Sequence, residues 1–117
     1  MKSQITLYDI AYARSGDKGA DVNIGIIAYN LEGFNFLNNL LDKQKIKEYF
    51  SSIKIADVEK YPIENLWAIN FILKGALGKG GSSSLRLDSQ GKALGQALLE
   101  MPISIDPSIL EKIRQKN

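Results

Sequence analysis

Residues 66–74, LWAINFILK, carry the strongest structural pattern in this sequence. Large apolar side chains occupy every second position: Trp67, Ile69, Phe71 and Leu73. Successive side chains of a strand point to opposite faces, so this spacing is typical of a strand with one buried face. We therefore expect a central strand at residues 66–74, whose four large side chains lie in the core beneath the helices.

Three further segments with strand composition precede it. Residues 5–13 and 22–29 are rich in β-branched and aromatic residues and contain no proline, which predicts a strand in each. Gly25 lies within the second of them, where a glycine indicates a bulge or a close approach of another backbone. A short strand is expected at residues 58–63, and Pro62 places its end at a sheet edge or in a turn.

Amphipathic spacing and capping residues predict helices at four places. The helices are expected to begin after Asn30, after Asp42, after Asp88 or Ser89, and after Asp106. A short strand at residues 85–87 and a last strand at residues 101–105 complete the chain.

The order of these elements is strand, strand, helices, strand, strand, helix, strand, helix. Antiparallel strands with helices laid on one face form an α+β fold. A ferredoxin-like antiparallel sheet with helices packed on one face accounts for this order. The length of 117 residues suits one domain, which we place at residues 1–117. The other face of such a sheet is free for solvent or a partner, and Tyr8, Ile10 and Tyr12 alternate on one side of the first strand, which predicts a homo-oligomer.

The composition argues against several classes of function. The net charge is +2 and no dense basic run is present, so nucleic acid is not expected as a partner. No apolar run approaches the roughly 18 residues of a membrane span, and no signal peptide is visible. We therefore expect a cytoplasmic protein with no membrane partner. The sequence has no cysteine and no histidine, so we expect no metal site and no cofactor, and any catalysis would rely on other groups.

A polar stretch, ARSGDKGADVN at residues 13–23, separates the first two strands. Its glycines allow positive φ and close approach of a ligand. Successive amides in such a loop can hold an anion, with Arg14 and Lys18 adding positive charge. The alternative is an Asp-rich hairpin whose side chains cap their own turn. The candidate ligand-binding residues here are Arg14, Ser15, Gly16, Asp17, Lys18, Gly19 and Asn23.

A second polar loop, GALGKGGSSS at residues 75–84, follows the central strand. The Walker pattern does not fit, because Leu73 occupies the position of its first glycine. The dinucleotide-binding pattern does not fit, because Ser83 occupies the position of its third glycine. A flexible linker is the alternative interpretation of this loop. The candidate ligand-binding residues here are Gly78, Lys79, Gly80, Ser82 and Ser83.

We expect the two loops to lie side by side and to form one anion site. Each loop follows a long strand, and parallel pairing of those strands would bring both loops to one edge of the sheet. Antiparallel pairing would separate them. Asn23 and Asn70 are unusual residues for strands and are candidates to point at one shared site.

Three stretches together resemble a known family: YARSGDKGADVNIGIIAY, NFILKGALGKGGSSSLRLD and SQGKALGQALL. They are similar to the ferredoxin-like C-terminal domain of the acyclic terpene utilization (AtuA) family, over nearly the whole chain. The resemblance implies a role in branched or terpenoid acyl-CoA catabolism. In that family the domain commonly follows a larger N-terminal domain, so the resemblance also implies a larger AtuA-type subunit as partner of this stand-alone small domain. It carries over no catalytic residue.

Three functional hypotheses follow. The leading one is an accessory, non-catalytic domain that binds an anionic small molecule, an acyl-CoA or a carboxylate, and supports a larger partner. The second is a small enzyme, or a subunit that completes an active site, with Lys18 or Lys79 holding the anion and Asp17 as acid or base. The third is a structural oligomerisation module.

Overall fold

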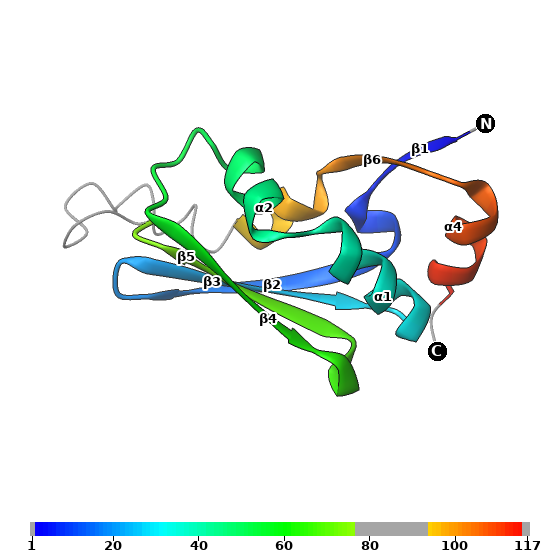
Figure 1. Cartoon of the computed structure of the whole chain (residues 1–117), viewed down its shortest axis with the longest axis horizontal. Helices are drawn as coiled ribbons and strands as arrows, with labels where there is room; N and C mark the ends of the chain where they lie inside the picture. Colours follow the sequence, from blue (N-terminus) through cyan, green and yellow to red (C-terminus); the bar gives the residue numbers. More distant parts are fainter. Residues whose placement is uncertain (1, 77–93, 116–117) are drawn as a thin grey trace.

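The computed structural model of this chain describes residues 2–76 and 94–115. Figure 1 shows how its strands and helices are arranged. In chain order they are β1 (Ser3–Thr6), the 3-10 turn η1 (Leu7–Asp9), β2 (Ala11–Lys18), β3 (Asp21–Ala28), α1 (Leu31–Leu40), α2 (Lys43–Tyr49), β4 (Asp57–Ile63), the 3-10 turn η2 (Glu64–Leu66), β5 (Ala68–Lys74), β6 (Pro102–Ile105) and α4 (Pro107–Ile113). Residues 94–99 are also helical. The expected strand at 85–87 and the cap at residue 88 or 89 lie outside the described residues.

The larger sheet has the strand order β2-β3-β5-β4, and every pair of neighbours in it is antiparallel. Strands β3 and β4 therefore run parallel to each other with β5 between them, and α1 and α2 connect them. This is the split βαβ unit of a ferredoxin-like fold. The expected α+β class, with an antiparallel sheet and helices on one face, is confirmed (Figure 1).

The core lies between this sheet and the helices. Alternate residues of β3 are buried, and they face α1 and α2 together with Ile69, Phe71 and Leu73 of β5. The alternation of LWAINFILK thus predicted the buried face of β5 correctly for these three residues. Pro62 lies in β4, an edge strand, where its missing N–H breaks no ladder bond.

The expected helix starts are confirmed where the structure describes them. The side chains of Asn30, Asp42 and Asp106 each accept a hydrogen bond from a backbone N–H in the first turn of α1, α2 and α4, respectively. In the described part of the chain, no helix is long and apolar enough to cross a bilayer.

The single strand expected at residues 5–13 is wrong. The chain instead leaves β1, makes the turn η1, and enters β2 in the other sheet. Strand β1 pairs antiparallel with β6, which is nearly 100 residues later in the chain. Leu7 and Ile10 are both fully buried. Residues three apart lie on the same side of a 3-10 turn but on opposite faces of a strand, so only the turn places both side chains in the core.

Trp67 packs against the core as expected but is only partly buried, and it lies outside the strand. It ends η2 with a φ of 54°, in the left-handed region, and β5 begins only at Ala68. Its N–H donates to the Glu64 carbonyl at 3.0 Å, and its own carbonyl accepts from the Ala28 N–H at 2.8 Å. These bonds fix the tight turn at the end of the β3–β5 ladder and leave the indole only half-buried.

A candidate ligand site on the open sheet face

Opposite α1 and α2, the larger sheet has a face over which no described helix lies (Figure 1). We call this the open face. The strand register places alternate residues of β2, β3, β5 and β4 on it: Tyr12, Arg14, Gly16, Asp21, Asn23, Gly25, Ile27, Ala68, Asn70, Ile72, Lys74, Glu59, Tyr61 and Ile63.

A pocket of about 260 Å³ opens beside the middle of this face. Its lining residues are Arg14, Ser15, Gly16, Asp17, Asn23, Gly25 and Asn70. The register explains the hollow: Arg14 pairs with Gly25, Gly25 pairs with Asn70, and Gly16 pairs with Asn23. Two glycines therefore lie where side chains would fill the space, with one guanidinium and two amides around them.

The fold does not require glycine at these two positions. A Cβ at Gly25 would lie 3.9 Å from Asn70 Oδ1, and a Cβ at Gly16 would meet no atom within 4 Å. Neither residue has a positive φ. Glycine inside a strand weakens it relative to alanine, so these residues are best explained by the space that they leave. The bulge that Gly25 suggested is absent, since the β2–β3 and β3–β5 registers run through it unbroken.

The polar groups around the pocket are available to a ligand. Within the described part of the chain, the side chains of Arg14, Asn23 and Asn70 hydrogen-bond to no other residue. The guanidinium offers two parallel N–H donors that match a carboxylate, and each amide offers further donors. The arrangement therefore suits a small anion with planar oxygens.

The polar stretch at residues 13–23 is a hairpin, as the alternative interpretation held, rather than a loop between two strands, although Asp21 accepts a hydrogen bond from Gly75 and not from its own turn. Arg14, Ser15, Gly16 and Asp17 lie within β2, and only Gly19 and Ala20 form the turn. A positive φ of 64° at Gly19 alone is typical of a type II′ turn. Solvent-facing positions of an edge strand tolerate polar residues, which explains why this composition looked like a loop.

A second glycine contact sets the position of the helical segment at 94–99. The Gly95 N–H donates to Ser15 Oγ at 3.3 Å, and a Cβ at Gly95 would lie 3.2 Å from that oxygen. The helix therefore packs directly on β2, on the covered side of the sheet and behind the pocket. This contact joins the ARSGDKG stretch to the GKALG stretch, which are far apart in the sequence.

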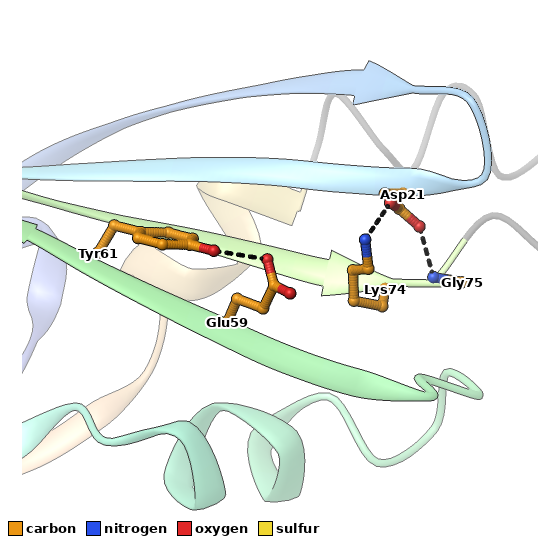
Figure 2. A network of polar contacts seen from close by, with 5 residues as sticks. All are labelled: Asp21, Glu59, Tyr61, Lys74 and Gly75. Atoms are coloured by element: carbon orange, nitrogen blue, oxygen red, sulfur yellow. Dashed lines mark hydrogen bonds and ion pairs between the residues drawn. The ribbon is translucent and has the colours of Figure 1, made fainter.

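Beyond the pocket, three polar contacts lie along the open face (Figure 2). Asp21 accepts a hydrogen bond from the Gly75 N–H at 2.8 Å and forms an ion pair with Lys74 at 3.2 Å. The Tyr61 hydroxyl donates to Glu59 at 2.8 Å. The Gly75 hydrogen bond lowers the pKa of Asp21, and Lys74 adds to the effect, while Asp21 raises the pKa of Lys74.

Asp21 is expected to make folding stability depend on pH. A carboxyl whose pKa is lower in the folded state stabilises the fold above the unfolded pKa, and this contribution is lost as the pH falls. Asp21→Asn should cost less than about 1 kcal/mol at pH 7, because the pair is partly exposed. In urea titrations this difference should shrink below about pH 4. Lys74→Met should keep most of the pH dependence, because it leaves the Gly75 bond in place. An equal cost for Asp21→Asn at pH 7 and at low pH would contradict the assignment.

The two polar segments begin at the same edge of the sheet. Strands β2 and β5 do not pair, because β3 lies between them, but both run antiparallel to β3 and therefore end together. The Asp21–Gly75 bond links the two segments directly. Gly78, Lys79, Gly80, Ser82 and Ser83 lie outside the described residues, as does the Lys18 side chain, so one shared anion site stays a prediction.

Gly25 was missing from the candidate residues chosen from the sequence, and Asn70 was named only as a residue that could point at a shared site. Both carried a usable signal, since glycine and asparagine are depleted in strand interiors. Their spacing in the sequence hides their proximity, which only the β3–β5 register reveals. Gly19 lies at the hairpin turn and does not line the pocket.

Comparison with protein families identifies the chain. The family model of the AtuA ferredoxin-like domain matches residues 5–104. The chain belongs to this family. The matched range includes every residue that lines the pocket. Searches of the curated proteins and of the solved structures found no match.

Proposed function

We propose that this AtuA ferredoxin-like domain is a non-catalytic binding domain that holds a small carboxylate in the pocket of the open face. The observation that carries the proposal is the meeting of Arg14, Asn23 and Asn70 around the hollow above Gly25. Arg14 would form the charge-assisted pair with the carboxylate, and the two amides would orient it.

The charge of the pocket supports a ligand with a single negative charge. Among the lining residues that the structure describes, Arg14 is the only cationic one and Asp17 the only acidic one. A carboxylate needs one guanidinium, whereas the several phosphates of a coenzyme A thioester require more cations. The family likeness supports a branched or terpenoid acyl acid as the natural ligand and a larger AtuA-type subunit as partner, and we also propose a cytoplasmic setting.

Binding of 3-methylbutanoate, a small branched carboxylate, tests the proposal by calorimetry. Loss of one charge-assisted pair is worth about 1.5–3 kcal/mol, so Arg14→Gln should raise the Kd roughly 10- to 100-fold. Gly25→Ala should weaken binding similarly by filling the hollow, while leaving stability unchanged or higher by about 0.5–1 kcal/mol.

Arg114→Gln is the matched control, because Arg114 is an exposed arginine at the end of α4. It should bind like the wild type. The proposal fails if the wild type does not bind the acid at about 10 mM, or if Arg14→Gln binds as tightly as the control.

A further inference from the structure

The open face carries large exposed side chains on both of its outer strands. Tyr12 on β2 is 47% exposed, and Tyr61 and Ile63 on β4 are 48% and 36% exposed. Ile27 and Ala68 complete the row between Tyr12 and Ile63. Contiguous apolar surface of this kind on a sheet face usually marks an interaction site.

The residues of this face are placed with an approximate two-fold symmetry. Residues that pair across the four strands form a row, such as Arg14, Gly25, Asn70 and Tyr61. Consider a two-fold axis that lies between the two copies, parallel to the strands and midway between β3 and β5. It places each row over the same row of the partner, with β2 over the partner's β4 and β3 over the partner's β5. In a face-to-face pair of copies it sets Tyr12 opposite the partner's Ile63. It also sets Gly25 opposite the partner's Asn70, across the pocket.

Charge complementarity favours this axis. It places Asp21 opposite the partner's Lys74, and Lys74 opposite the partner's Asp21, so unlike charges meet twice. Arg14 comes opposite the partner's Tyr61, with the partner's Glu59 one row away. An axis across the strands would instead place Asp21 and Lys74 over the partner's Ile27 and Ala68, which would bury both charges against apolar residues.

We propose that a second copy of this chain packs on the open face around this axis, and that the partner's Tyr61 closes the Arg14 pocket. Two sheets packed in this way keep their strands within about 30° of each other and interdigitate their side chains. The hydrogen bond of Tyr61 to Glu59 holds the phenol in place, and a ring over a guanidinium is a favourable cation–π contact. The closure of the pocket, but not the dimer itself, rests on the proposed function.

Sedimentation equilibrium without any carboxylate tests the dimer. The wild type should sediment at twice its chain mass of 13.0 kDa at about 100 μM. Ile63→Asp should raise the dimer dissociation constant at least about 100-fold, because it buries a carboxylate against the ring of the partner's Tyr12, whose negatively charged face repels it. Ile109→Asp is the matched control on α4, where Ile109 is 42% exposed, and it should remain dimeric. Circular dichroism checks that both variants fold.

Cross-linking tests the register independently of stability. The chain has no cysteine, so a mixture of Arg14→Cys and Tyr61→Cys chains can be joined only at these positions. A bis-maleimide with a reach of about 10 Å, the spacing of packed sheets, should give a covalent heterodimer. A mixture of Arg14→Cys with Ile109→Cys should not.

The outcomes separate this inference from the proposed function. A monomeric wild type, or a fully dimeric Ile63→Asp variant, overturns the dimer whatever the ligand does. A dimer that binds no carboxylate leaves the interface standing and removes the proposed function. Tyr61→Leu should keep the dimer but raise the Kd for 3-methylbutanoate about fivefold, and unchanged binding would overturn the closure of the pocket by Tyr61.

Discussion

Replacing Phe71 with alanine is expected to lower the free energy of unfolding by about 3–5 kcal/mol. Phe71 is fully buried in β5 and faces the core between the sheet and the helices. It pairs with Ile24 on β3 and with Lys60 on β4, so its ring lies at the centre of the sheet. Removal of the ring loses its apolar burial and leaves a cavity that the paired strands cannot close by moving.

Urea denaturation followed by circular dichroism measures this change. Phe71→Leu should cost about 1 kcal/mol, because most of the buried volume is kept. Ile109→Ala, at an exposed position of α4, should change stability by less than about 0.5 kcal/mol. A loss below about 1 kcal/mol for Phe71→Ala would show that β5 is not the central core strand.

The second large effect is expected at Asn30, the one polar residue in the described part of the chain that is buried, with 8% of its surface exposed. Its Oδ1 caps α1 by accepting from the Gly33 N–H at 2.8 Å. Its Nδ2 donates to the carbonyls of Lys112 and Gln115, each at 2.9 Å, at the end of α4. One side chain therefore joins the start of α1 to the end of the last helix.

Asn30→Ala should lower the free energy of unfolding by about 3 kcal/mol, since it removes a cap and leaves two carbonyls without their donor. Asp42→Ala is the matched control, because Asp42 caps α2 at an exposed position. It should cost about 1 kcal/mol. Asn30→Ser keeps a capping oxygen but lacks the amide donors, so its cost should lie between the two. Equal costs for Asn30→Ala and Asp42→Ala would show that the bonds to α4 contribute nothing.

Local sequence determined most of the elements around the core. The period of two in LWAINFILK predicted which side of β5 is buried, because that period follows from strand geometry alone. Asn30, Asp42 and Asp106 predicted three helix starts, since a cap needs only its own first turn. Pro62 predicted an edge strand because proline cannot donate to a central ladder.

Tertiary structure decided which segments become neighbours, because the periodicity of a segment contains no information about its pairing partner. Residues 5–13 look like one strand, but burial of Leu7 and pairing with β6 divide them between two sheets. Trp67 fits the alternation of the strand that follows it, yet its backbone N–H closes a turn on the Glu64 carbonyl, and the Ala28 N–H of β3 holds its carbonyl in that position. In each case a partner distant in the sequence outweighed the local preference.

The candidate site shows the same division. The sequence alone singled out Asn23 and Asn70, because asparagine is uncommon in strands. It also indicated that the polar stretch around Arg14 could bind an anion. Only the insertion of β3 between β2 and β5 sets Arg14, Gly25 and Asn70 in one row of the sheet. The alternation along a strand determines the face on which a side chain lies, whereas the pairing register determines its neighbours on that face, and the register is set by contacts across the whole fold.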